Sequence, residues 1–524
     1  MELVNARYVT GRTLDLDGPG AVIHVRAESS ELTALAARIA ALGHYSRRDF
    51  RDFVALGIRC TPDVAEALAD AMELLATDPS ASPYDARQTL DAARRPTWVQ
   101  ALEAAKAQGI PALLDDEGLS IGAGCRSATY GLAVAPASIG SHGRIPVAMV
   151  TGTNGKTTTT RFLAAMGTAR GLTVGHTSSD GIFVGDGCVE RGDWSGPGAA
   201  RRLLRHGRVE FAVLETARGG ILRRGVQVDF ADVAVVTNVS ADHLGEWGVN
   251  TVDEMAEVKL LVGDGLRPGG TLVMNRENWR WSDVLVRFCD RRPDVHVRWF
   301  GAGGQARVRG EVVTVDGVDV IAVEDIPLTF GGRAVHNVEN ALAASLAGVA
   351  MGLPVPIVAA GLRRLTPDPE HSAGRGNVFE VPVEGGVATV FVDFAHNAEG
   401  MRHLAALALA WPARRRLLVA GQAGDRTDEL LDSFTRLALG MSPARVYLKE
   451  MAKYQRGRKP GEVVGRMRAI FSAAGVPTSS WPDELAATDA ALSDLHDGDF
   501  LLVLAHTDAA GVVERVRARV GLPT

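Results

Sequence analysis

Cysteine is scarce in this chain, with four in 524 residues. Cys60, Cys125, Cys188 and Cys289 lie far apart, and no two of them form a C-x-x-C pair. This spacing argues against a cysteine zinc site. Thiols are normally reduced in the cytosol, so we expect four free thiols, either buried or partly exposed.

Long apolar runs are also lacking. The N-terminal stretch MELVNARYVTGRTLDLDG carries charges within its first dozen residues and has no apolar segment typical of a secretory signal. No window approaches the roughly 20 apolar residues that a membrane-spanning helix needs. We therefore expect a cytoplasmic protein with no membrane partner.

Neither sign of charge dominates. The chain has 56 basic and 62 acidic residues, which gives a net charge of -6. The longest basic clusters, residues 414–416 and 456–459, are short. They suit solvated surfaces or local anion sites but are too short to follow a nucleic acid. A nucleic-acid partner is therefore not expected.

The first part of the chain mixes helical and strand patterns. ELTALAARIAALG and TPDVAEALADAMELL have apolar residues at helical spacing, and LDAARRPTWVQALEAAKAQG indicates two helices around Pro96. AVIHVRA and PALLDDEGLSIGAG are strand candidates. We expect a separate N-terminal α+β domain over residues 1–142, with the segment PASIGSHGRIP as a linker.

After the linker, short apolar runs alternate with helical stretches. The runs IPVAMV, EFAVLE, VAVVTNVS and GGTLVMN predict a parallel sheet covered by helices on both faces. The pattern starts again near residue 378 with VATVFVDFAHN, RRLLVAGQAGD, ARVYLKE and DFLLVLAH. The sequence thus predicts an α/β fold, with a central domain over residues 143–374 and a smaller C-terminal α/β domain over residues 375–524.

A short glycine-rich loop separates the first of these strands from its helix. The common nucleotide-binding P-loop has four residues between its first glycine and the Gly-Lys pair, whereas only Thr153 and Asn154 separate Gly152 from Gly155 here. Backbone N–H groups of such a loop bind phosphate at the N-terminus of the following helix. We expect a nucleotide site, with the lysine on the β- and γ-phosphates and the first threonine hydroxyl on Mg²⁺. Its loop residues are Gly152, Thr153, Asn154, Gly155, Lys156, Thr157 and Thr158. The alternative is an ordinary glycine-rich turn.

Two candidate metal ligands follow neighbouring strands. Glu215 ends EFAVLE, and His243 follows VAVVTNVS. Ligands of parallel sheets bind at the carboxyl ends of the strands, and a carboxylate suits Mg²⁺, which prefers oxygen. The alternatives are a helix cap or surface position for Glu215 and a structural role for His243.

The shortened loop TGTNGKT resembles that of the Mur ligases and their relatives, folylpolyglutamate synthetase and cyanophycin synthetase. The resemblance is greatest to the Mur-ligase-like half of cyanophycin synthetase. It extends in family order over roughly residues 143–475, through TSSDGIFVGDGCVERGDWSGPGAARRLL, VLETARGGILRRG, TNVSADHLGEWGVNTVDEMAEVK, GGRAVHNVENALAA, GRGNVFE, VDFAHNAEG, GDRTDE and RGRKPGE. Cyanophycin synthetase also carries an ATP-grasp unit ahead of this half. Only about 140 residues precede the loop here, so we do not expect that unit.

The resemblance implies roles for further residues of the nucleotide site. His243 matches the metal histidine of the family. Lys259, sixteen positions later, matches a lysine that is often carbamylated and bridges to a second magnesium; a solvated helix lysine is the alternative. His336, Asn337 and Asn340 would contact adenine, unless the asparagines cap their helix. Arg375 would reach the phosphates, Asp393 the ribose or the linker, and Asn275, at the end of GGTLVMN, also belongs to the nucleotide set.

The substrate residues are expected on both sides of the nucleotide. Arginine forks suit carboxylates, so Arg218, Arg223 and Arg224 would hold an acidic acceptor, with surface ion pairs as the alternative. By resemblance, Asp180 joins this set. In the last domain, Asp425 and Asp428 would bind a cationic amino acid; the alternative is that both are ordinary surface residues. His396 either contacts the substrates or packs against neighbouring side chains.

The predicted activity is ATP-dependent amide-bond formation through an acyl phosphate, with ATP and Mg²⁺ as cofactors. The partners would be a small acidic acceptor and an amino acid amine. The Mur-like half of cyanophycin synthetase joins a β-carboxylate to arginine. A homo-oligomer or a separate partner ligase is also possible. Residues 1–142 would shape the acceptor site or dock a partner. The alternatives are a nucleotide-gated scaffold without turnover and a small-molecule kinase.

Overall fold

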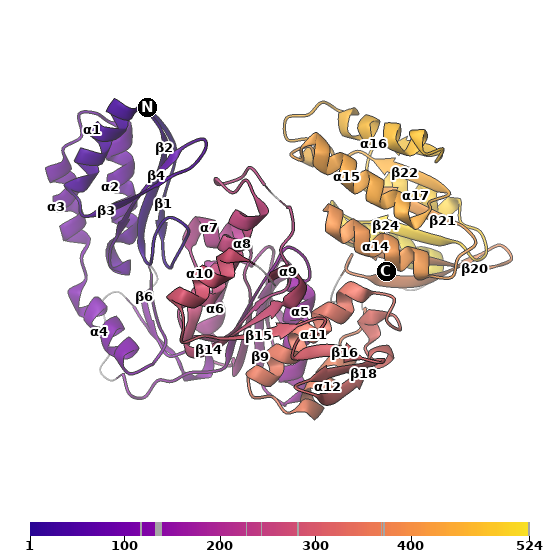
Figure 1. Ribbon diagram of the computed structural model, residues 1–524, viewed down its shortest axis with the longest axis horizontal. Helices are drawn as coiled ribbons and strands as arrows, with labels where there is room; N and C mark the ends of the chain where they lie inside the picture. The colour runs from indigo at the N-terminus through magenta and orange to yellow at the C-terminus, as the bar shows by residue number, and fades with distance from the viewer. Residues whose placement is uncertain are drawn as a thin grey trace. The chain divides into compact units, whose positions relative to one another are not determined.

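The computed structural model of the chain describes residues 1–115, 118–131, 139–226, 228–242, 244–279, 282–367, 369 and 373–521. These residues form two compact units (Figure 1). The first comprises Met1–Ile321 and Glu339–Leu362, and the second comprises Ala322–Val338 and Arg363–Thr524. The boundaries expected after residues 142 and 374 stay predictions.

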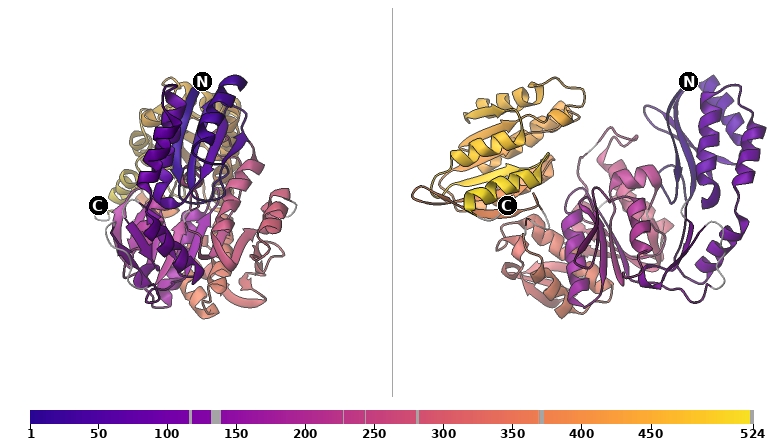
Figure 2. Two further views of the ribbon diagram at one scale, coloured as in Figure 1. Left: turned by 90° about the vertical axis from the view of Figure 1, so that its left-hand side faces the viewer. Right: turned by 180° about the vertical axis from the view of Figure 1, so that it is seen from behind.

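The first unit begins with a four-stranded antiparallel sheet of order β1-β2-β4-β3. Its strands are β1 (Glu2–Val9), β2 (Gly20–Arg26), β3 (Tyr45–Asp49) and β4 (Val54–Arg59). Helices α1 (Ser29–Ala40), α2 (Ala65–Thr77) and α3 (Pro83–Ala93) cover one face (Figure 1, Figure 2). Ile23, Leu35 and Leu68 are buried between the sheet and the helices. The predicted α+β character of this region is confirmed.

A smaller three-stranded sheet follows, of β5 (Ala112–Asp115), β6 (Gly118–Ile121) and β7 (Ala128–Tyr130). Helix α4 (Pro96–Ala107) packs on it through Trp98 and Leu102, which are buried in one cluster with Leu119. The proline at its first position fits a helix start, since that position needs no N–H donor. The predicted break at Pro96 and the predicted strands are therefore confirmed.

The centre of the first unit is an eleven-stranded sheet of order β11-β10-β9-β12-β8-β13-β14-β15-β16-β17-β18. The seven strands from β9 to β16 in this spatial order, β9-β12-β8-β13-β14-β15-β16, are parallel to their neighbours. At the two ends of this parallel part, β10 pairs antiparallel with β9 and β17 pairs antiparallel with β16. The strands are β8 (Val147–Thr151), β9 (Val174–Ser178), β10 (Gly181–Val184), β11 (Gly187–Arg191), β12 (Phe211–Glu215), β13 (Ala231–Val236), β14 (Leu266–Asn275), β15 (His296–Phe300), β16 (Ala306–Arg309), β17 (Val312–Val315) and β18 (Val318–Ala322). The parallel core is confirmed, and the antiparallel ends were not expected.

Helices surround the parallel core. They are α5 (Lys156–Ala169), α6 (Pro197–Leu204), α7 (Arg218–Arg224), α8 (Val252–Leu260), α9 (Arg276–Trp279), α10 (Asp283–Arg291), α11 (Val335–Ala350) and α12 (Val355–Arg364). Every residue of β8 and β12 is buried, which is typical of parallel strands covered on both faces. Glu215 pairs with Val150 and Val236 with Thr151. The ends of β8, β12 and β13 therefore meet at one edge of the sheet.

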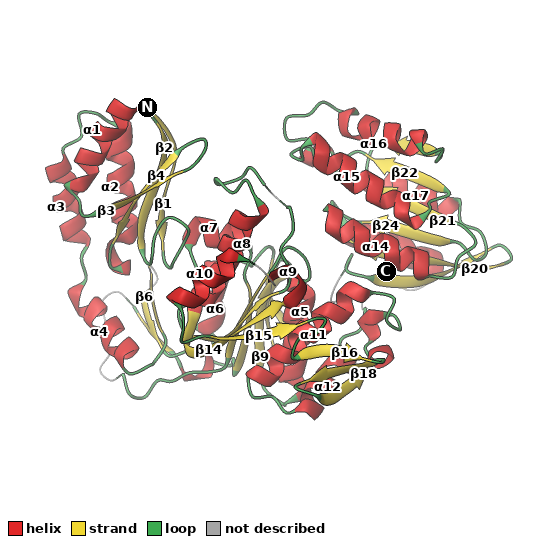
Figure 3. Cartoon of the chain, viewed as in Figure 1, coloured by secondary structure: helices red, strands yellow, loops and turns green. Residues whose placement is uncertain are grey.

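The second unit has a six-stranded sheet of order β19-β20-β24-β21-β22-β23, parallel except for β19 (Figure 3). Its strands are β19 (Asn377–Val383), β20 (Gly386–Asp393), β21 (Arg416–Ala420), β22 (Arg445–Lys449), β23 (Thr478–Trp481) and β24 (Phe500–Leu504), and its helices are α14 (Ala398–Ala410), α15 (Asp428–Ala438), α16 (Glu462–Ala473), α17 (Glu484–Ser493) and α18 (Ala509–Val520). Asn397 and Thr427 cap α14 and α15 with their side chains. The second α/β domain is confirmed. Nowhere in the described chain is a helix long and apolar enough to cross a membrane.

Candidate functional site

The phosphate-loop candidate connects β8 to α5 and depends on two glycines with positive φ angles. Gly152 has φ 150° and Gly155 has φ 82°. A Cβ atom on Gly152 would lie 1.8 Å from Thr237 Oγ1, and one on Gly155 would lie 2.1 Å from Asn340 Oδ1. Both distances are far inside van der Waals contact, so the loop requires glycine at both positions.

We expect Gly152→Ala to destabilise the protein by about 2 kcal/mol, because the new methyl group clashes and the backbone is strained. Gly198→Ala is the matched control. Gly198 lies in α6, where a Cβ atom would have no other atom within 4 Å, and alanine in a helix is favoured by roughly 0.5–1 kcal/mol. Denaturant unfolding measures both effects. Equal midpoints for the two variants would contradict the proposed loop geometry.

The segment after β13 holds the loop from one side. The Asn154 N–H donates to Asn238 Oδ1 at 2.9 Å, and Asn238 Nδ2 donates back to the Asn154 carbonyl at 3.1 Å. Thr237 Oγ1 also donates to that carbonyl, at 2.6 Å. These contacts hold the loop against the segment after β13. Thr237 and Asn238 were missed in the sequence, although two polar residues directly after an apolar strand were a usable signal.

Lys156 and Thr157 begin α5 at the mouth of the loop. Lys156 Nζ donates to the carbonyls of Gly152 and Thr153, both at 3.0 Å. Thr157 Oγ1 donates to Glu215 Oε2 at 2.9 Å, and these two side chains are 5% and 2% exposed. An ammonium and a buried pair of oxygen ligands thus lie at the same strand edge, as a phosphate and a magnesium ion require.

The remaining residues predicted to bind the nucleotide or the metal are spread over several elements. His243 lies outside the described residues. Among the described residues, no group of three or more His, Cys, Asp or Glu side chains gathers around a metal position. Thr158 is half-buried in α5. Asn275 Oδ1 accepts from the Glu277 N–H at 3.0 Å and so supports the start of α9. The metal site and the Asn275 role stay predictions.

Lys259 is buried, with 4% of its surface exposed. A capping box of Thr251 and Glu254 starts its helix, α8. Burial lowers the pKa of its amine well below the usual value, the nearby cations of Lys156 and Arg218 lower it further, and Asp242 opposes them. The alternative of a solvated helix lysine is therefore wrong. A lowered pKa favours the neutral form of the amine, which is the nucleophilic form.

The arginines expected to bind the acceptor lie in α7, and they differ in their contacts. Arg218 is 11% exposed and donates to Glu246 Oε2 at 2.5 Å. Arg223 Nε donates to the Gly219 carbonyl at 3.2 Å and is otherwise exposed. Arg224 Nη1 donates to the Tyr8 carbonyl at 3.0 Å. Asp180 accepts from Arg161 at 2.9 Å. Substrate binding by these residues stays a prediction.

The N-terminal strand β1 is fastened to α7. The Thr10 N–H donates to the Arg224 carbonyl at 2.8 Å, and the Val226 N–H donates to the Arg12 carbonyl at 3.0 Å. Arg7 Nε donates to the Leu222 carbonyl at 3.2 Å. The N-terminal region is therefore bound to the helix that carries the candidate acceptor arginines.

The N-terminal region also holds the loop after β13. The Arg7 guanidinium lies 5.1 Å from the centre of the Trp247 ring, and it pairs with the buried Asp15 at 2.6 Å. Trp247 has a φ of 56°, which is uncommon for a residue with a side chain. Its neighbour Glu246 is the partner of Arg218. Contacts from β1 thus restrain both partners of this candidate substrate pair.

In the second unit, His336 and Asn337 lie within the first turn of α11 rather than at its cap. Burial lowers the pKa of His336 to about 3, and its ring centre lies 5.5 Å from that of His403. Asn337 Nδ2 donates to the Leu328 carbonyl at 2.8 Å. Since α11 begins at Val335, both Asn337 and Asn340 are inside the helix, and neither is the residue that precedes it. A neutral imidazole is compatible with the predicted adenine contact.

Arg375 and Asp393 lie together in the second unit. The Arg375 guanidinium lies 4.9 Å from the centre of the Phe394 ring. Asp393 Oδ1 accepts from the Ala395 N–H at 2.9 Å. Burial raises the pKa of Asp393, although the charge of Arg375 opposes this shift. The ring of His396 lies 5.2 Å from that of Phe394, so packing accounts for at least part of its environment.

The two aspartates expected to bind the amine are paired with arginines of this chain. Asp425 pairs with Arg456. Asp428 accepts from Arg458 at 2.8 Å and from Arg466 at 2.7 Å. These carboxylates therefore bind guanidinium groups, which is the chemistry predicted for them, but the partners seen are internal.

Family comparisons agree with this arrangement. The model of the Mur ligase middle domain matches residues 150–348, and the model of the Mur ligase glutamate ligase domain matches residues 374–507. The two matches together span more than half of the chain. The chain belongs to the Mur ligase family. The phosphate loop, Glu215 and Lys259 fall within the middle domain, and Asp393, Asp425 and Asp428 fall within the glutamate ligase domain.

Curated relatives of the chain include cyanophycin synthetases and ligases named for diaminopimelate. The cyanophycin synthetase of Synechocystis sp. is 37% identical over 399 residues, which cover 72% of this chain and 44% of that protein. The chain thus spans less than half the length of that curated relative. The UDP-N-acetylmuramoyl-L-alanyl-D-glutamate–2,6-diaminopimelate ligase of Geobacillus thermodenitrificans is 26% identical, with 69% of this chain and 73% of that protein covered.

Solved structures share the fold. The E. coli FolC structure, in complex with DHPP and ADP, has a TM-score of 0.55 and 20% identity to this chain. The match covers 71% of this chain and 89% of that one. The α/β fold with a smaller C-terminal domain is therefore confirmed by an independent comparison.

Proposed function

We propose that this chain is an ATP-dependent ligase that activates a carboxylate as an acyl phosphate and joins it to an amine. The observation that carries the proposal is the meeting of three features beside the phosphate loop, where the charges of Lys156 and Lys259 interact. These are the Lys156 ammonium on a glycine loop, the buried Thr157–Glu215 oxygen pair, and the buried Lys259. The identity to cyanophycin synthetases and the ADP complex of FolC support the same conclusion.

The reaction would proceed in two displacements. A carboxylate oxygen of the acceptor attacks the γ-phosphorus of ATP, the bond to the β-phosphate oxygen breaks, and ADP leaves. The amine then attacks the acyl carbon, inorganic phosphate leaves, and the amine loses a proton. Phosphoryl transfer depends mainly on positioning and charge neutralisation. Here the Lys156 ammonium and the loop N–H groups would face the developing negative charge.

Mg²⁺ fits the oxygen pair beside the loop. Thr157 and Glu215 offer a hydroxyl and a carboxylate 2.9 Å apart, and Mg²⁺ prefers oxygen ligands of this kind. When bound, the ion would neutralise phosphate charge. His243 is proposed as a further ligand from the family resemblance alone.

Lys259 is proposed to be carbamylated. The neutral form of its amine would attack CO₂, a C–N bond would form and a proton would be released, which leaves a carbamate with one negative charge. This exchange would place an anion near the cations of Lys156 and Arg218, which otherwise lower the lysine pKa. A buried carbamate paired with cations is more favourable than a buried lone charge.

We expect Lys259→Met to lower kcat by roughly 10- to 100-fold, as loss of a group that supports a metal site does. The side chain of methionine is apolar and similar in length, so the fold should persist. ¹³C NMR with labelled bicarbonate should show a carbamate signal in the wild-type protein that is absent in Lys259→Met. A wild-type protein without this signal, or a variant with full activity, would refute the assignment.

The N-terminal region is proposed to orient the acceptor site, because β1 holds both α7 and the loop with Glu246. We expect Trp247→Ala to raise the KM of the acceptor about two- to five-fold, the size of a lost cation–π contact. The KM of ATP should stay unchanged and serves as the internal control. Equal changes in both constants would mean that the loop acts on the whole site rather than on the acceptor.

The acceptor is proposed to be acidic and the amine cationic, in line with the cyanophycin resemblance. Arg218 and Arg223 would face the acceptor carboxylates. Asp425 and Asp428 would bind the guanidinium of the amine substrate. This guanidinium would replace the arginines of the chain that now pair with the two aspartates.

Phosphate release, measured with ATP across a matrix of dicarboxylates, aspartyl peptides and amino acids, tests the proposal. A ligase releases phosphate only when an acid and an amine are both present. A stable phosphorylated acid formed without amine would favour a small-molecule kinase. Nucleotide binding without release in any pair would favour a scaffold.

A further inference from the structure

A cavity lies in the first unit, at the edge of the central sheet opposite the phosphate loop. It has a volume of about 310 Å³. Val226, Val228 and Asp229, which precede β13, line it, and so do Asp264 and Gly265, which precede β14. The phosphate loop follows the other end of β8, which pairs with β13. A six-residue strand is about 20 Å long, so the two sites are separate.

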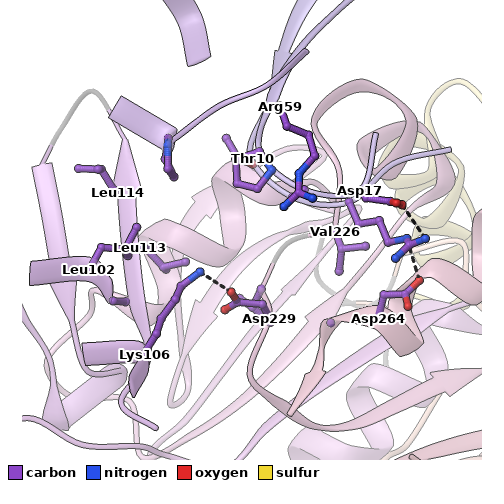
Figure 4. Close-up of a pocket in the computed structure, with 18 of the residues that line it drawn as sticks. Thr10, Asp17, Arg59, Leu102, Lys106, Leu113, Leu114, Val226, Asp229 and Asp264 are labelled. Carbon is purple, nitrogen blue, oxygen red and sulfur yellow. Dashed lines mark hydrogen bonds and ion pairs between the residues drawn. The ribbon is translucent and has the colours of Figure 1, made fainter. Parts of the chain in front are cut away.

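The cavity has walls of two kinds. Leu102, Leu113 and Leu114 line one side (Figure 4), with Val226 and Val228 also apolar. Arg59 and Asp17 come from the opposite side in the same view. A site that combines an apolar wall with a few charged groups is typical of small-molecule binding.

Most of the charged side chains that line the cavity form ion pairs with other side chains of this protein. Lys106 Nζ lies 2.7 Å from Asp229. Arg12 pairs with Asp17 at 2.6 Å and with Asp264 at 3.4 Å. Arg292 pairs with Asp294 at 2.8 Å. Each of these cations already has a carboxylate partner.

Arg59 differs from these cations. At the end of β4 its side chain is exposed, and among the residues that the structure describes its guanidinium has neither a hydrogen-bond acceptor nor an acidic partner. Its guanidinium lies against Gly18, whose Cβ position would be 3.6 Å from Arg59 Nη2, and it extends toward the cavity (Figure 4). A guanidinium offers a planar fork of donors that matches a carboxylate.

We infer that this cavity binds a small carboxylate with a branched apolar body. The carboxylate would pair with Arg59, and the apolar body would lie against the leucine wall. A free apolar amino acid and a simple branched acid share this chemistry. Inorganic phosphate has the charge but no group for the leucines.

The position of the cavity gives such binding a structural consequence. Thr10 and Arg12 line it, and the same two residues hydrogen-bond to Arg224 and Val226 at the end of α7. Lys106 and Asp229 join the N-terminal region to the central sheet across it. A bound ligand would therefore strengthen the docking of the N-terminal region.

Titration calorimetry of the full chain without nucleotide tests the inference. The probes are 4-methylpentanoate, L-leucine and inorganic phosphate. We expect at least one of the two carboxylates to bind with a Kd on the order of 0.1–1 mM, as suits a ligand of eight or nine heavy atoms. Phosphate should bind at least 10-fold more weakly. Tighter binding of leucine would identify an amino acid site, and tighter binding of 4-methylpentanoate a simple acid site.

Three variants locate the binding. Arg59→Ala should weaken it at least 10-fold, the effect of a lost charge-assisted hydrogen bond, and Leu113→Trp should weaken it by filling the cavity. Arg51→Ala, which removes another exposed arginine of the N-terminal region, should have no effect. Circular dichroism checks that each variant is folded.

Several results would overturn the inference. They are no binding of either carboxylate, equal affinity in Arg59→Ala and wild type, or phosphate binding as tight as the carboxylates. A Lys156→Ala variant separates the two sites, because it should keep full carboxylate binding. Loss of carboxylate binding in that variant would place the probe at the phosphate loop and would also refute the second site. None of these results depends on ligase turnover.

Discussion

Replacing Lys156 with alanine is expected to lower ATP-dependent phosphate release by roughly 10²- to 10³-fold, the usual effect of losing one preorganised group that stabilises transition-state charge. The Nζ atom lies over the loop, within 3.0 Å of two of its carbonyls. At this position it would face the β- and γ-phosphates. The measurement is phosphate release at saturating acid and amine.

Arg170→Ala is the matched control. Arg170 is exposed at the C-terminal end of the same helix, α5, so the variant removes one cation from the same element without touching the loop. We expect it to retain full activity. Unchanged phosphate release by a folded Lys156→Ala variant would show that the phosphates bind elsewhere.

Glu215→Gln is expected to lower activity at limiting Mg²⁺ by on the order of 10²-fold, with a smaller loss at high Mg²⁺. Glutamine keeps the size of the side chain and one oxygen but removes the charge. Since Glu215 is only 2% exposed and accepts from Thr157, the substitution should alter metal affinity more than folding. A magnesium titration of activity measures the shift.

Glu210→Gln serves as the control for this charge. Glu210 is exposed just before β12, at the end of the strand away from the loop, where it accepts from the Thr173 N–H. It should show the wild-type magnesium dependence. The same dependence in Glu215→Gln would mean that the metal is held by other residues.

The fold could be predicted where the pattern of apolar residues is strong. VAMVT and FAVLE are apolar throughout most of their length, and both form fully buried parallel strands. The antiparallel ends of the central sheet were not foreseen. Strand β11 has mostly exposed residues and β18 is exposed over its first part, so neither carries the apolar alternation from which strands are recognised.

The site was predictable in its residue types but not in its contacts. The loop glycines, Thr157 and Glu215 come together as expected because parallel strands end at one edge. The burial of Lys259 agrees with the site role that the family resemblance implied, whereas the residue pattern alone left a solvated helix lysine open, because lysine is mostly exposed. The internal pairing of Asp428 with Arg458 and Arg466 was also missed, since those partners lie 30 and 38 residues away in the sequence.

The transfer of ¹⁸O from the acceptor carboxylate to phosphate tests the central claim most directly. The acid that supports phosphate release is labelled in its carboxylate oxygens, and the inorganic phosphate is examined by mass spectrometry. Formation of an acyl phosphate predicts one ¹⁸O atom in each phosphate released with amide product. Amide product accompanied by unlabelled phosphate would contradict the proposed mechanism.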